Sequence, residues 1–178
     1  MKKRDGMKIK EIVFMGIFST IIMDIGFVFL KVTKIVKGSM EPQFLGRWIL
    51  NMFNGEFIQE NIRIATQMNL EKPVSIITHY LTGIFLVGIF LLLRIKTKIF
   101  PGSIHMGLVF GWVTLLLPWF FFYPCIGFGF LGLDTPEGSN NIVYSIIYHS
   151  FFGLGITLWL GFVRKFVIKD KDIQSDDA

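Results

Sequence analysis

The chain has 178 residues, of which 52% are hydrophobic and 20 are phenylalanine, and its formal net charge is +5. It is too apolar for an ordinary soluble domain, and its charges lie between apolar runs, as in membrane proteins. No basic stretch alternates with aromatic residues, so the positive charge indicates an anionic lipid surface and excludes nucleic acid as a partner. The length fits a single integral membrane domain over residues 1–178.

Four apolar runs reach the length of about 20 residues that a membrane-spanning helix needs. They cover residues 12–30, 74–93, 104–122 and 142–163. The predicted fold is therefore an all-α membrane protein, a bundle of four transmembrane helices with outer loops over residues 31–73 and 123–141. The first run follows a basic N-terminus, as a secretory signal does, but it is too long for one, contains Asp24 and lacks a small-residue cleavage site. It is predicted to remain as a transmembrane helix.

Lysine and arginine are distributed unevenly between the segments that flank the spans. The two termini and the second loop together contain twelve of these residues, against six in the first loop and none in the third. The positive-inside rule therefore places both termini in the cytoplasm, with the chain in the cell (inner) membrane.

The first loop contains a predicted amphipathic helix on the outer surface of the bundle. Its apolar face is formed by Phe44, Leu45, Trp48, Ile49, Met52 and Phe53, and its polar face by Gln43, Arg47 and Asn51. Two interpretations of Arg47 remain open. The favoured one makes Arg47 and Trp48 an anchor at the membrane interface. In the other, Arg47 points into the bundle and binds an anion or a carboxylate.

The third loop is rich in aromatic residues and glycine. An aromatic stretch runs from Pro118 to Pro124, and the apolar segment 127–132 contains three glycines. Such a segment is too apolar for a solvated loop. We expect it to fold back into the mouth of the bundle, where irregular backbone is tolerated if protein covers it.

The same nine-residue pattern, S-I-I-x-H-x-x-x-G, occurs at residues 75–83 and 145–153, each time near the start of an apolar run. It contains His79 in the second span and His149 in the fourth. An ionisable residue inside a membrane span is costly, which makes both histidines candidate functional residues.

Asp24 lies in the first span at a similar depth to the two histidines, roughly 7 to 11 Å below the outer boundary at about 1.5 Å per residue. His79 and His149 each lie on a stripe of small and polar residues, which is expected to face the bundle interior. The sequence therefore predicts a polar intramembrane cluster of Asp24, His79 and His149. Tyr80 and Tyr148 flank the histidines and, with Arg47, are candidate anion or ligand contacts.

The repeated pattern also indicates two related halves of two spans each, which a rotation axis along the membrane normal would superimpose on each other. Met15-Gly16 in the first span and Met106-Gly107 in the third support this hypothesis. In the sequence, no residue of the third span corresponds to Asp24.

Three interpretations of the cluster remain open. In the first, the cluster stabilises the helix bundle by hydrogen bonds, and the protein has a structural or interaction role. Alternatively, it binds or translocates a small solute or a proton, in which case a homodimer is expected for so small a transporter. As a third alternative, His79, His149 and Asp24 bind haem or a divalent metal, which is not favoured because no His-x-x-His or Glu-x-x-His spacing is present. No catalytic nucleophile or base is identified, so an enzyme is not favoured.

Several short motifs together resemble the bacterial domain-of-unknown-function family 2938. They are Met23-Asp24, Gly46-Arg47-Trp48, His79-Tyr80 with Gly83, Pro118, Pro124 with Gly127 and Gly129, Thr135-Pro136, and His149 with Phe152-Gly153 and Gly155. The resemblance covers nearly the whole chain from the first span to the fourth. It implies a bacterial multi-pass membrane protein and names no reaction.

Overall fold

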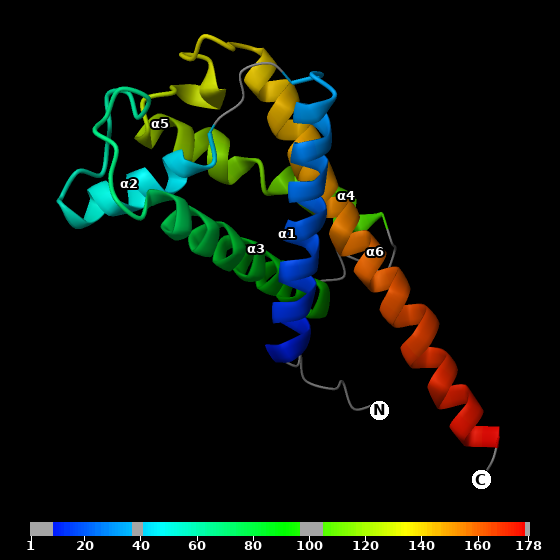
Figure 1. Ribbon diagram of the computed structural model, residues 1–178. Helices are drawn as coiled ribbons and strands as arrows, with labels where there is room; N and C mark the ends of the chain where they lie inside the picture. Colours follow the sequence, from blue (N-terminus) through cyan, green and yellow to red (C-terminus); the bar gives the residue numbers. More distant parts are fainter. Residues whose placement is uncertain (1–8, 37–40, 97–104, 177–178) are drawn as a thin grey trace.

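The computed structural model describes residues 9–36, 41–96 and 105–176, with side chains as far as Phe162, and Figure 1 shows their arrangement. All regular elements in these ranges are helices. The all-α prediction is therefore confirmed.

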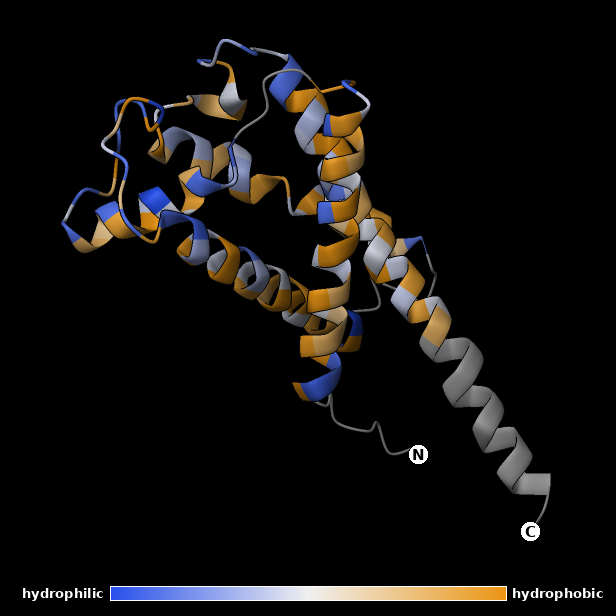
Figure 2. Ribbon diagram, viewed as in Figure 1, coloured by the Kyte–Doolittle hydropathy of each residue, from blue (hydrophilic) through white to orange (hydrophobic). Residues whose placement is uncertain are grey.

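Four helical segments are long and apolar enough to cross a membrane. They are α1 (Ile9–Val32), α3 (Glu71–Lys96), the segment Met106–Cys125, and the part Asn140–Phe162 of α6 (Asn140–Asp176). Apolar residues predominate along them in Figure 2. The four-span prediction is confirmed, and α1 and α3 extend past the predicted apolar runs at both ends.

The third span is not a continuous α-helix. It begins with α4 (Met106–Val113), passes through a turn at Thr114 and Leu115, continues as a π-helix over Pro118–Phe122 and ends with α5 (Tyr123–Cys125). Pro118 has no backbone N–H to donate to the preceding turn, which accounts for a break at this point.

Glycines allow two pairs of spans to cross at short distance. Between α1 and α3, a Cβ added at Gly16 would lie 2.6 Å from Ile84 Cα, and one added at Gly83 would overlap Thr20 Oγ1. Between α4 and α6, a Cβ added at Gly153 would lie 2.6 Å from the Gly107 carbonyl oxygen. Small residues thus permit the backbones to approach, as is common between membrane helices.

These two crossings are built in the same way. In each, the glycine four residues after the histidine of the repeated pattern packs against a Met-Gly pair on the preceding span: Gly83 against the turn that starts at Gly16, and Gly153 against Gly107. The equivalent contacts support the hypothesis of two related halves. The first and last spans also pack together: α1 lies along α6, side by side in Figure 1, with Gly155 against Ser19.

Apolar side chains fill the end of the bundle that contains the N-terminal part of α1. This core consists of Met15, Val87, Phe90, Leu91, Phe110, Phe152 and Ile156, which come from all four spans. The Phe90 and Phe110 rings, 5.1 Å apart between centroids, join α3 to α4. The polar residues of the candidate cluster lie nearer the opposite end.

That opposite end is covered by a cap. The cap contains the predicted amphipathic helix, α2 (Gln43–Phe53), the segment 56–65 and the glycine-rich loop. Its apolar centre consists of Phe44, Trp48, Ile62, Phe122, Tyr123, Ile126 and Phe128. The residues just before the glycine-rich loop contact the first loop: Gln59 N donates to Cys125 O at 2.8 Å and Ile62 N to Ile126 O at 3.0 Å. The glycine-rich loop itself contacts the first loop where Gly127 packs on Glu60.

Gly127 explains why this contact needs glycine. Its φ of +76° lies in the left-handed region, and an added Cβ would overlap the backbone of Glu60. Both the local conformation and the close approach of the two loops exclude a side chain there.

The α4–α6 crossing gives a stability prediction. Gly153→Ala is expected to lower the free energy of unfolding by about 1–3 kcal/mol, because the new methyl group forces the two helices apart. Gly161→Ala is the matched control on the same helix, since an added Cβ there meets no described atom within 4 Å. Thermal unfolding of both variants in detergent checks this, and equal melting temperatures for the two would contradict the packing described above.

Candidate functional site

Asp24 on α1 joins two side chains from α3. His79 Nε2 lies 3.0 Å from Asp24 Oδ1, and the Tyr80 hydroxyl donates to Asp24 Oδ2 at 2.9 Å. The rings of His79 and Tyr80 meet edge to face with centroids 5.8 Å apart. Both carboxylate oxygens therefore have a partner on the neighbouring span.

This Asp24–His79–Tyr80 triad lies well inside the spans and is still accessible. Asp24 is eight residues before the end of α1 and His79 eight residues after the start of α3, which corresponds to about 12 Å along each helix axis. The side chains of Asp24 and His79 are 43% and 34% exposed.

His149 has a different partner. Its Nδ1 lies 2.7 Å from Thr114 Oγ1 in the third span, and Thr114 Oγ1 also donates to the Gly111 carbonyl at 2.6 Å. The hydrogen bonds divide the predicted three-residue cluster. One group contains Asp24, His79 and Tyr80, and the other contains His149 and Thr114.

Thr114 is the residue that sequence reasoning missed. It lies seven residues after Gly107, whereas Asp24 lies eight residues after Gly16, so each is about two turns beyond the glycine crossing. The two spacings differ by one residue and threonine is not ionisable, so the expectation that no residue of the third span corresponds to Asp24 stays a prediction. The sequence does not single out Thr114, because a threonine in an apolar helix is common.

The other positions of the repeated pattern have packing roles. The Ser75 hydroxyl donates to the Pro42 carbonyl at the start of α2, and the Ser145 hydroxyl lies 2.9 Å from the Tyr123 hydroxyl. Tyr148 packs its ring against Phe27 with centroids 5.2 Å apart. Each copy thus uses its serine to contact the cap end and its glycine to cross the neighbouring span.

The described side chains do not support a metal centre of the predicted kind. Within the parts of the chain that the structure describes, no three His, Cys, Asp or Glu side chains come together as metal ligands. The reason is that Thr114 is the hydrogen-bond partner of His149, while Asp24 and His79 pair with each other.

Arg47 is buried, which corrects the favoured interpretation of an interfacial anchor. Only 1% of Arg47 is exposed, and Asn51 beside it is also buried. Arg47 Nε donates to Glu71 Oε2 at 2.7 Å and its Nη2 to Glu71 Oε1 at 3.0 Å, and its Nη1 donates to the Ile62 carbonyl at 2.8 Å. The hydrogen bond with Glu71 raises the pKa of Arg47 above its ordinary value. The alternative interpretation, an arginine that points inward to a carboxylate, matches this geometry.

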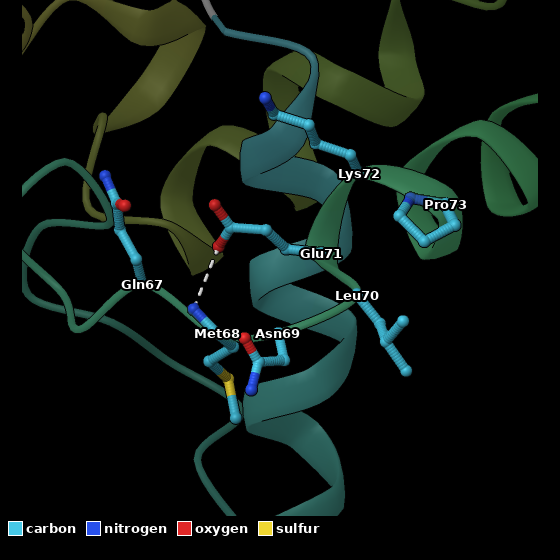
Figure 3. A pocket seen from close by; sticks show the side chains of 7 residues that line it. All are labelled: Gln67, Met68, Asn69, Leu70, Glu71, Lys72 and Pro73. Carbon is cyan, nitrogen blue, oxygen red and sulfur yellow. Dashed lines mark hydrogen bonds between the residues drawn. The ribbon is translucent and has the colours of Figure 1, made fainter.

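The Arg47–Glu71 pair connects the cap to the spans. Gly46 packs so closely on the first turn of α3 that an added Cβ would overlap the Glu71 carbonyl. Beside the pair, residues 67–73 form a pocket of about 500 Å³ (Figure 3). Figure 3 shows the Glu71 carboxylate close to Met68, whose backbone N–H donates to it at 3.3 Å, while Leu70 points away. The pocket is lined by one short segment of chain and contains none of the triad.

Comparison with known proteins identifies the family of the chain. No curated protein matches the chain, and no solved structure matches it. The family model described as "Protein of unknown function (DUF2938)" matches residues 13–163, from the first span to the fourth. The chain therefore belongs to the domain-of-unknown-function family 2938.

Proposed function

We propose that the protein binds a proton or a small polar solute inside the membrane at the Asp24–His79–Tyr80 triad and passes it across. The observation that carries this proposal is the Asp24 carboxylate, which bridges α1 and α3 through His79 and Tyr80. Asp and His side chains paired within spans are the usual groups of proton relays. Imidazole is suited to the role because it changes charge near neutral pH.

The accessibility of the triad favours transport over a purely structural lock. Polar groups that only fix the packing of a bundle are usually enclosed, whereas about two fifths of the Asp24 side chain is exposed. The proposal places the chain in the cell membrane of a bacterium with both termini in the cytoplasm, following the distribution of lysine and arginine. It includes assembly as a homodimer, since four spans enclose little space for a path.

Flux measurements test the proposal. Purified protein is reconstituted in liposomes that contain a pH-sensitive dye, a membrane potential is imposed, and proton entry is followed without solute and with each of a panel of small polar solutes. Wild type is expected to show flux, and Asp24→Asn is expected to lower it at least about 100-fold, because the amide cannot take up and release a proton as a carboxylate does. Glu60→Gln, the same chemical change at an exposed carboxylate of the first loop, is the matched control. Absence of flux in the wild type under all conditions, or equal flux in Asp24→Asn, would overturn the proposal.

A further inference from the structure

The hydrogen bonds at Thr114 determine which nitrogen of His149 carries its hydrogen. Thr114 Oγ1 makes two contacts of hydrogen-bond length, 2.6 Å to the Gly111 carbonyl and 2.7 Å to His149 Nδ1. Each contact needs one hydrogen, and the threonine hydroxyl supplies only one. The carbonyl can only accept, so the hydroxyl hydrogen points to Gly111. The second hydrogen therefore belongs to His149 Nδ1.

The same reasoning gives the opposite result for His79. An ionised Asp24 can only accept hydrogen bonds, and Tyr80 already donates to its Oδ2. The contact between Asp24 Oδ1 and His79 Nε2 therefore needs the hydrogen on Nε2. The neutral rings of the two matching patterns thus carry their hydrogens on different nitrogens, with Nδ1 unprotonated in His79 and Nε2 unprotonated in His149.

We infer that Thr114 is a positioning residue that keeps the neutral His149 protonated on Nδ1 and thereby leaves Nε2 as its proton-accepting nitrogen. The second part of the inference rests on the proposed function and deepens it. A proton bound at the triad passes next to His149 Nε2, and a bound solute with an N–H or O–H group donates a hydrogen bond to the same nitrogen. Tyr148, the neighbour of His149, packs on Phe27 with ring centroids 5.2 Å apart, and a Cβ added at Gly26 would overlap the Phe151 ring. The part of α6 that contains His149 therefore packs against the part of α1 that contains Asp24.

The location of Thr114 adds to this role. It lies directly after α4, at the turn where the third span leaves α-helical geometry before Pro118. The histidine bond therefore connects α6 to the break in the third span. Breaks in membrane helices occur at sites where substrate or ions bind, because the freed backbone groups can take part in binding.

Nitrogen NMR tests the inference directly. The chain has three histidines, His79, His105 and His149, so a sample labelled with ¹⁵N-histidine gives few signals, and single substitutions assign them. The neutral form of His149 is expected to show a protonated Nδ1 and an unprotonated Nε2, and the neutral form of His79 the reverse. Thr114→Val is expected to shift the His149 signals toward the other tautomer, while Thr114→Ser retains the wild-type pattern because its hydroxyl makes the same two bonds.

The outcomes separate this inference from the proposed function. An unprotonated His149 Nδ1 in the wild type overturns the inference, even if Thr114→Val does not fold. Unchanged His149 signals in a folded Thr114→Val protein also overturn it. If the tautomers are as expected and Thr114→Val lowers the flux at least tenfold while Thr114→Ser does not, both parts stand. A wild type without flux but with the expected tautomers overturns the proposed function and leaves the role of Thr114 intact.

Discussion

Replacing Arg47 with methionine is expected to lower the free energy of unfolding by about 3–5 kcal/mol, because Glu71 is then left buried without its opposite charge. The loss also removes the hydrogen that Arg47 donates to the Ile62 carbonyl. Glu71→Gln is expected to cost less, since the amide oxygen still accepts a hydrogen bond from the guanidinium. The measurement is denaturant unfolding of the purified protein in detergent, followed by tryptophan fluorescence, to which Trp48 in the cap contributes.

A double variant and a control make the prediction specific to the ion pair. Arg47→Met with Glu71→Met is expected to recover part of the loss, because an apolar pair leaves no buried charge, although the Ile62 carbonyl still lacks its donor. Lys72→Met changes an exposed charge beside Glu71 and is expected to leave stability within about 0.5 kcal/mol of the wild type. If Arg47→Met and Lys72→Met have the same effect, the pair does not connect the cap to the spans.

The pH dependence of this contribution follows from the raised pKa of Arg47. A cation with a raised pKa in the folded state contributes stability that is fully present below its unfolded pKa and is lost only as the pH rises through the folded value. Both values for Arg47 lie far above neutrality. The stabilisation by Arg47 is therefore expected to be constant from neutral to moderately alkaline pH.

The sequence predicts the membrane spans better than it predicts which side chains form hydrogen bonds or ion pairs with each other. Hydropathy is a sum over about 20 residues, so the error at any one position hardly changes the predicted helix. The partner of a buried charge depends instead on one contact between distant segments. Arg47 lies on the polar face of α2, which the amphipathic pattern places outward, and its partner Glu71 is 24 residues away at the start of α3.

The histidines illustrate the same limit. Their depth and their small-residue stripes indicated that they point to neighbouring spans, and the structure brings His79 to Asp24. The pattern could not indicate that the matching histidine, His149, has a threonine as its partner. Two matching local patterns do not need to have equivalent neighbours, and here the partner of His79 is the acid Asp24, whereas the partner of His149 is the hydroxyl of Thr114.

The second large effect is expected at the triad. His79→Gln is expected to lower flux at least about 100-fold, the lower range of what a positioned proton-transfer group contributes. Combining it with Asp24→Asn is expected to lower flux no further than Asp24→Asn alone, because residues that act as a unit give non-additive losses. Tyr80→Phe is expected to have a smaller effect, since it removes one hydrogen bond to Asp24 and leaves the Asp24–His79 contact in place.

Stability measured on the same variants separates transport from a structural role. Hydrogen bonds between membrane helices contribute about 0.6 kcal/mol on average and at most about 1.7 kcal/mol, so each of these variants is expected to remain folded. A relay therefore predicts a large loss of flux with a small loss of stability. If the triad only stabilises the bundle, variants that remove more hydrogen bonds are expected to be less stable. Any flux is then expected to fall only as far as stability falls. Additive losses of flux in the Asp24–His79 double variant would show that the two residues do not transfer a proton together.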